Sequence, residues 1–163
     1  MKYKKIGILI ATLWVGFILY MSSQTAVNSE HMSIAITKNL VKNAEAIGVL
    51  KGNTAYSSAI IRRADDIVRS FAHILMYFIL AGIVSFFLWL WGARIIKSTV
   101  ITFLLCLGIS IIDEINQMGY YGRNSNGQVS AGLDDIVKDT LGILLAIMIC
   151  IILRKFLQLE NKQ

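Results

Sequence analysis

Four long apolar runs divide the sequence, and polar stretches of different length separate them. The runs lie at Ile6–Met21, Phe71–Trp91, Ser98–Ile112 and Thr140–Leu153. Each run is longer than a typical strand, and the chain contains no proline, which would interrupt a helix. The pattern predicts an all-α fold, a bundle of four transmembrane helices with spans at about 6–24, 70–91, 97–117 and 135–154.

The first run follows a basic start, Lys2 to Lys5, which is also typical of a cleaved signal peptide. The run is longer than a usual signal-peptide core and contains Trp14 and Tyr20. We therefore favour a retained membrane helix.

The segment 25–68 is predicted to be an extracytoplasmic loop that forms amphipathic helices. Residues at helical spacing make one face of the first helix: Ile34, Thr37, Val41, Ala44 and Gly48. Asn28 or Ser29 is predicted to cap this helix, and Asn53 to cap a second one that runs through Ile60. Lysines on the opposite face suit a helix lying flat on the membrane. A helix packed over the outer ends of the spans fits equally well.

The link between the second and third runs is only Gly92–Lys97, which predicts an antiparallel helical hairpin. Basic residues are more frequent near the span ends on the side of the N-terminus. Because lysine and arginine near spans favour the cytoplasm, both termini are predicted to be cytoplasmic.

Composition supports a membrane protein made of one domain. The chain has 163 residues, and 56% of them are hydrophobic. Its mean hydropathy of +0.64 exceeds that of ordinary soluble domains. The net charge of +6 comes from basic residues beside apolar runs, where they meet lipid headgroups, so membrane lipids and not nucleic acid are the expected partners. Cys106 and Cys150 lie inside apolar runs, as small buried hydrophobes do.

The third and fourth runs are too short to span a membrane alone. They contain 15 and 14 residues, whereas a hydrocarbon core needs roughly 20, so each falls short by roughly 8 Å. Lys97 and Arg154 mark the inner ends, so the polar residues at the outer ends must lie at or below headgroup level. Carboxylates do not face lipid without cost, which predicts a shared polar chamber open to the outer leaflet. Local thinning of the membrane is the competing explanation.

Helical spacing aligns these polar residues in three sets. Arg69, His73 and Tyr77 share a face of the second span, Asp113 and Gln117 share a face of the third, and Asp135, Asp139 and Gly142 share a face of the fourth. Each set alone has an ordinary structural explanation, such as helix capping or a loop charge. Their common position on one side of the membrane favours a functional interpretation.

The residue types suggest acid–base chemistry on an anionic molecule. The candidate catalytic residues are His73, Asp113, Glu114 and Asp135, which could exchange protons as a cluster. The candidate substrate-binding residues are Arg69, Arg123, Tyr77, Gln117, Ser23, Gln24 and Asp139, in which the arginines would hold a carboxylate or phosphate. Hard oxygen ligands would also suit magnesium or calcium, but we assign no metal site and no cofactor.

These same residues carry a resemblance to the VanZ-like family of small bacterial membrane proteins. The pattern reads SSQ at 22–24, RSFAHILMY at 69–77, DEINQ at 113–117, GR at 122–123 and DIVKDTLG at 135–142. Ser70 stands where the family usually has lysine, Asn116 replaces a frequent histidine, and the linker between Arg123 and Asp135 looks longer than usual. The resemblance implies a multi-pass protein of the bacterial cytoplasmic membrane and a link to the cell envelope. The founding member is associated with low-level resistance to the glycopeptide teicoplanin.

Three functions fit these observations. The first is a membrane enzyme that acts at the outer leaflet on an anionic envelope molecule, such as a cell-wall precursor or another lipid-linked molecule. The second is a non-catalytic protein that binds a lipid, a wall precursor or a drug. The third, a small transporter, is least favoured because the four spans show no broken-helix signal.

Overall fold

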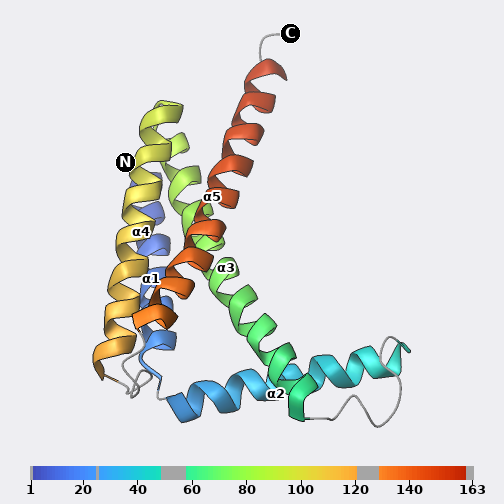
Figure 1. Ribbon diagram of the computed structural model, residues 1–163. Helices are drawn as coiled ribbons and strands as arrows, with labels where there is room; N and C mark the ends of the chain where they lie inside the picture. The colour runs from blue at the N-terminus through green and yellow to red at the C-terminus, as the bar shows by residue number, and fades with distance from the viewer. Residues whose placement is uncertain (1, 25, 49–57, 121–128, 161–163) are drawn as a thin grey trace. The chain divides into compact units, whose positions relative to one another are not determined.

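Five α-helices make up the described part of the chain (Figure 1). The computed structural model describes residues 2–24, 26–48, 58–120 and 129–160. The helices are α1 (Lys2–Ser22), α2 (Ala26–Ala46), α3 (Ser58–Leu90), α4 (Ile95–Tyr120) and α5 (Val129–Glu160). Of these, α1, α3, α4 and α5 are long and apolar enough to cross a membrane. The predicted all-α fold with four long apolar helices is confirmed.

Several helix boundaries differ from the prediction. The second span is part of one helix that begins at Ser58, so the loop helix predicted to run through Ile60 is the first part of α3. No glycine or proline lies between Ser58 and Ala81, so nothing in this stretch stops the helix. The prediction that Asn28 or Ser29 caps the first loop helix is wrong, because α2 begins at Ala26. Asn53 lies outside the described residues.

The chain forms two compact units. The loop unit comprises Gln24–Ala72, and the bundle unit comprises Met1–Ser23 together with His73–Gln163. In the loop unit, Thr37 and Val41 are buried on the predicted face of α2. The Thr37 hydroxyl donates a hydrogen bond to Asp65 Oδ1 at 3.1 Å, which joins α2 to the first part of α3.

The bundle unit is apolar outside and carries polar groups inside. Its core draws on all four long helices and contains Ile18, Tyr77, Leu80, Ala81, Cys106, Ile143, Ala146 and Ile147. Large aliphatic side chains such as Leu13 and Leu104 are more than 60% exposed. Serine, threonine and acidic side chains are buried instead. This arrangement suits hydrocarbon as the surrounding medium, because lipid solvates the exposed aliphatic surface.

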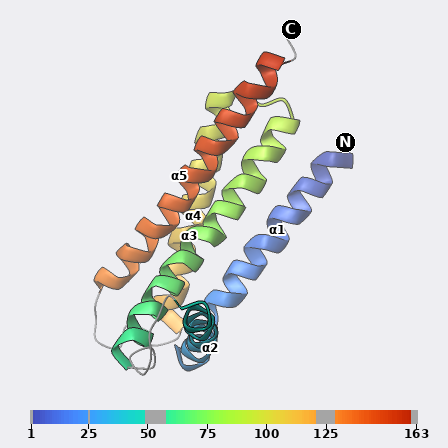
Figure 2. The same cartoon turned by 90° about the vertical axis from the view of Figure 1, so that its right-hand side faces the viewer.

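Within the bundle unit, successive helices run in opposite directions (Figure 2). The tight link after α3 has the hydrogen bonds of a Schellman motif: Gly92 N–H to Trp89 O and Ala93 N–H to Leu88 O. Gly92 adopts φ 79°, which suits glycine because it lacks Cβ. The alternation brings the C-terminal ends of α1 and α4 to the same end of the bundle as His73 and the first turns of α5.

Gly142 lets α3 and α5 approach backbone to backbone. A Cβ atom at this position would collide with the carbonyl oxygen of Ile74 and lie 3.1 Å from the Phe78 nitrogen. Ile74 follows His73 in the sequence, and Asp139 lies three residues before Gly142 on the same face of α5. The close contact therefore sets the distance between the two helices where their polar side chains meet.

We predict that Gly142→Ala separates α3 from α5 and destabilises the protein by at least about 2 kcal/mol, because backbone atoms cannot move aside as a flexible side chain can. The measurement is thermal or denaturant unfolding in detergent micelles. Gly108→Ala on α4 is the matched control, since a Cβ there meets nothing within 4 Å. It should stay within about 1 kcal/mol of wild type, on the stabilising side. Equal behaviour of the two variants would contradict the role assigned to Gly142.

Candidate functional site

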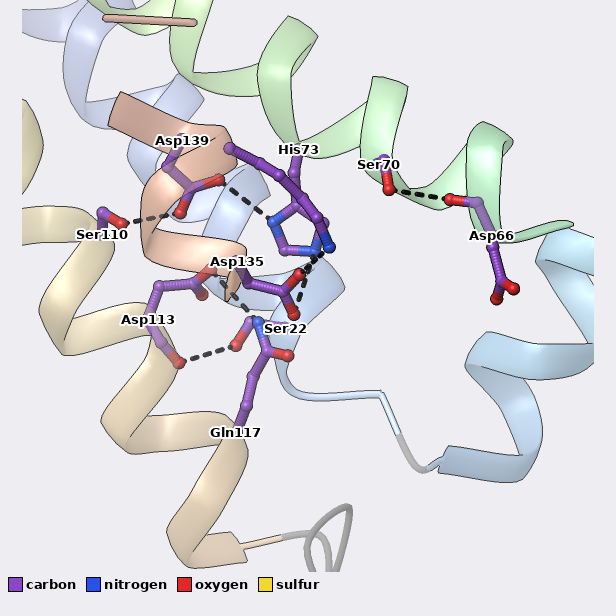
Figure 3. Close-up of polar contacts among 10 residues, drawn as sticks. Ser22, Asp66, Ser70, His73, Ser110, Asp113, Gln117, Asp135 and Asp139 are labelled. Atoms are coloured by element: carbon purple, nitrogen blue, oxygen red, sulfur yellow. Dashed lines mark hydrogen bonds and ion pairs between the residues drawn. The ribbon is translucent and has the colours of Figure 1, made fainter. Parts of the chain in front are cut away.

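Polar side chains from all four long helices meet at one end of the bundle unit (Figure 3). His73 extends from α3 toward two carboxylates of α5, Asp135 and Asp139. Ser110 and Asp113 face the same region from α4, and Ser22 contributes from the end of α1. We call these residues, together with Tyr77, Glu114, Gln117 and Lys138, the His73 cluster.

Asp139 holds His73 from one side. The His73 Nδ1 atom lies 3.1 Å from Asp139 Oδ1, and the Ser110 hydroxyl donates to Asp139 Oδ2 at 2.6 Å. With the carboxylate ionised, Nδ1 carries the proton and donates it, which fixes both the tautomer and the ring orientation. The series Ser110–Asp139–His73 thus links α4, α5 and α3, and Asp139 is only 2% exposed.

The second ring nitrogen of His73 faces Asp135. The distance from Nε2 to Asp135 Oδ2 is 3.9 Å, which is too long for a hydrogen bond. Asp135 is paired instead with Lys138, whose ammonium lies 2.7 Å from Asp135 Oδ1. The hydrogen bond at Nδ1 therefore fixes the orientation of Nε2, and Nε2 itself makes no hydrogen bond to Asp135. An oriented imidazole with one available nitrogen is the arrangement of a general acid or base.

Asp113 is also almost fully buried, with an exposed fraction of 2%. Gln117 Nε2 donates to its Oδ2 at 3.3 Å, and the Ser22 hydroxyl lies 3.4 Å from its main-chain oxygen. Its Oδ1 and the Tyr77 hydroxyl are both buried without a hydrogen-bond partner among the described residues. The Tyr77 and Asp113 side chains lie close enough to interact with each other, so a polar group of a ligand would join an existing pair of buried polar atoms.

The cluster contains more acid than base. Asp113, Glu114, Asp135 and Asp139 stand beside one lysine and one histidine on the same helix ends. Glu114 is only 7% exposed, and the described residues give its carboxylate no hydrogen bond or ion pair. Buried carboxylates in apolar surroundings are stable only when paired, so this excess favours the uptake of a proton or the binding of a cationic group.

The structure does not bring every predicted site residue into the cluster. Ser23 donates its hydroxyl to the main-chain oxygen of Tyr20. Arg69 and Gln24 belong to the loop unit. Arg123 lies outside the described residues. The proposed binding roles of these four residues remain predictions.

Sequence reasoning did not single out Ser22, Ser110 or Lys138 as site residues. Ser110 lies three residues before Asp113 and Lys138 three residues after Asp135, and this spacing places each pair on one helix face. This spacing is the feature of the sequence that could have identified Ser110 and Lys138 as neighbours of the predicted site residues. Asp139 was predicted to bind substrate, but it contacts His73 directly, whereas Asp135, predicted as catalytic, lies further from it.

The geometry does not define a metal site. Among the described residues, no group of three or more histidine, cysteine, aspartate or glutamate side chains is arranged to hold a metal ion.

Comparison with known proteins identifies one family. The sequence pattern of the family described as VanZ/LLP1 matches residues 7–154. The matched region contains every residue of the His73 cluster. No curated protein and no solved structure matches the chain.

We predict that Ser110→Ala and Asp139→Asn are energetically coupled, because the serine donates to the carboxylate that orients His73. A double-mutant cycle on unfolding in detergent should give a coupling free energy of about 1–3 kcal/mol. The control cycle pairs Asp139→Asn with Ser85→Ala, since Ser85 donates to Thr102 in another part of the bundle. This pair should be additive within about 0.5 kcal/mol. Additivity in both cycles would refute the series Ser110–Asp139–His73.

Proposed function

The chain belongs to the VanZ/LLP1 family and is a multi-pass membrane protein, and on that premise we propose that it is an envelope enzyme in which His73 transfers protons. The substrate is an anionic, lipid-linked molecule of the cell envelope, taken from the outer leaflet of the cytoplasmic membrane. Asp139 orients the imidazole, and Asp113, Glu114 and Asp135 are the carboxylates that exchange protons with it.

The observation that carries this proposal is the position of His73 between two aspartates. One of them is at hydrogen-bond distance from Nδ1, and the other lies 3.9 Å from Nε2. Here Nε2 is left for a reacting group, and Asp135 is close enough to stabilise the imidazolium that forms when Nε2 accepts a proton.

The anionic substrate is proposed from two arginines outside the His73 cluster, whereas the excess of carboxylates in the cluster suits a cationic or proton-donating group of the same molecule. Arg123 follows α4 in the sequence, and Arg69 precedes His73 by one helical turn, so both are candidates to hold a phosphate or carboxylate. The buried Asp113 Oδ1 and Tyr77 hydroxyl suit a hydroxyl or amide group of the same molecule. A molecule with a lipid anchor reaches such a buried cluster from within the membrane, without crossing water.

One observation favours a second function, non-catalytic binding. Asp135 and Asp139 already have partners in the protein, Lys138 for the first, and Ser110 and His73 for the second. A cluster that is largely satisfied in this way can hold a ligand by shape and hydrogen bonds alone. In that case His73 would be a hydrogen-bond donor to the ligand.

The resemblance to VanZ connects either function to antibiotic response. We propose that the chain lowers susceptibility to teicoplanin by modifying or sequestering the envelope molecule it binds. The family match supports membership alone, and the teicoplanin link is part of this proposal.

We predict that His73→Gln abolishes turnover while leaving the protein folded, since glutamine keeps much of the hydrogen bonding but cannot carry a proton. The assay incubates the protein in vesicles with a bacterial envelope lipid extract and follows mass changes by liquid chromatography and mass spectrometry. The rate at which wild type converts an envelope lipid should fall by at least about 100-fold in His73→Gln. Asp135→Asn should also lose most of the activity.

Expression of the same variants in a susceptible strain tests the link to teicoplanin, and only wild type should raise the inhibitory concentration. Leu104→Met, an exposed change on α4 nine residues before Asp113, is the control and should retain activity. Binding without catalysis would be favoured if no protein, wild type included, altered any lipid. In that case His73→Gln and Asp135→Asn should each reduce the amount of lipid that co-purifies with the protein, partially and to a similar extent.

We predict that the loop carrying Arg123 faces the cell exterior. In a background with Cys106→Ala and Cys150→Ala, Arg123→Cys should react with a membrane-impermeant maleimide in whole cells. Arg94→Cys, between α3 and α4, is the matched control and should react only after permeabilisation. The opposite labelling pattern would place the His73 cluster at the cytoplasmic face and exclude an outer-leaflet substrate.

A further inference from the structure

A second polar region lies at the other end of the bundle unit. A pocket there is lined by Ser85 and Trp89 of α3, Ser98 and Thr99 of α4, and Cys150 and Arg154 of α5, with isoleucines between them. Ser98 and Arg154 each lie 15 residues along their helices from Asp113 and Asp139, respectively. At about 1.5 Å per residue, this is roughly 22 Å from the His73 cluster, so the two regions are separate.

Arg154 supplies the positive charge of this pocket. Its side chain lines the pocket, and its Nε atom is buried without a hydrogen-bond partner in the described part of the chain. A guanidinium N–H that is shielded from water and unpaired is energetically unfavourable in the protein alone. It would be satisfied by an anion bound in the pocket, and guanidinium groups bind phosphate well.

The start of α4 lies beside the same pocket, which Ile95, Ser98 and Thr99 of this helix line. The first hydrogen bond of this helix runs from Ser98 N–H to Arg94 O at 2.9 Å, so the N–H groups of residues 95–97 have no acceptor within the helix. Ser98 is only 7% exposed and lines the pocket. Thr99 adds a second hydroxyl. Backbone and hydroxyl donors at a helix start favour an anion.

The rest of the lining is apolar. Trp89, Ile95, Ile147 and Ile151 contribute to the wall, so a ligand here meets both donors and hydrocarbon. Exposed lysines and arginines surround this end of the bundle: Lys4, Lys5, Arg94, Lys97 and Lys155. A soluble anion would not use the apolar wall, whereas a phospholipid would place its phosphate on Arg154 and Ser98 and its acyl chains along the isoleucines.

From these contacts we propose that this pocket is a binding site for the headgroup of an anionic phospholipid. The phosphate accepts hydrogen bonds from Arg154, the Ser98 hydroxyl and the first N–H groups of α4. The site joins α3, α4 and α5 through the lipid. It is independent of the proposed chemistry at His73.

The test counts retained lipids by native mass spectrometry after purification from vesicles of phosphatidylglycerol mixed with phosphatidylcholine. Wild type should retain one phosphatidylglycerol in preference to phosphatidylcholine. Arg154→Gln should lower this retention by about 10-fold or more, because it removes a charged donor to the phosphate. Ser98→Ala is the milder second variant, with an expected loss of about three-fold.

Lys155→Gln is the matched control, because it removes the same charge from the neighbouring, exposed position. It should leave retention within two-fold of wild type, roughly 0.4 kcal/mol in binding free energy. His73→Gln should not change retention either, which separates this site from the proposed function. Equal losses for Arg154→Gln and Lys155→Gln would overturn the proposal, since they would indicate general charge attraction. Displacement of the lipid by millimolar inorganic phosphate would overturn it in favour of a soluble anion.

Discussion

The close backbone contact of α3 and α5 at Gly142 is the constraint on which the His73 cluster depends. A side chain at this position would meet the Ile74 carbonyl and the Phe78 nitrogen and hold the helices apart. His73 and Asp139 come from these two helices and sit beside the contact, so their 3.1 Å separation follows from it. Small residues at helix contacts are a general means of bringing helices together in membranes, where no hydrophobic force acts between them.

A second contact fixes α1 against the same region. The indole N–H of Trp14 donates to the main-chain oxygen of Met76 at 3.0 Å, three residues after His73. This bond orients α1 so that Ser22, at its end, reaches the main-chain oxygen of Asp113. The cluster is therefore held by contacts between helices that lie just inside it, toward the middle of the bundle. Its polar side chains then meet in a fixed arrangement, as acid–base chemistry requires.

The polar regions at the two ends of the bundle differ in charge. The end with His73 holds four carboxylates, while the end with the pocket holds Arg154 among exposed basic residues. Between them the core is apolar apart from small hydroxyl groups, such as the Ser85–Thr102 pair. We propose different partners for the acidic and the basic end, a substrate that exchanges protons at the first and an anionic lipid at the second. The apolar middle separates them and anchors both in the membrane.

Sequence alone determined the four membrane-length helices and the end at which the polar residues gather. These features follow from local properties: apolar runs of membrane length, the absence of proline, a short link at Gly92 and carboxylates at fixed helical spacing. It also indicated His73, Asp113 and Asp139 as candidates, because each lies in or beside an apolar run where charge is costly. It misplaced the start of α2 and divided α3 in two, since the polar residues before Phe71 conceal a helix that nothing interrupts.

Only the tertiary structure decided which of these side chains meet. Spacing places Asp135 and Asp139 on the same face of α5, so it could not show that Asp139 contacts His73 while Asp135 pairs with Lys138. It gave no reason to prefer Ser110 among the small residues of α4, or Arg154 among the basic residues at the other end. Such choices depend on the rotation of each helix about its axis and on the distance between helices. Both are set by contacts between residues far apart in the sequence, such as Gly142 with Ile74.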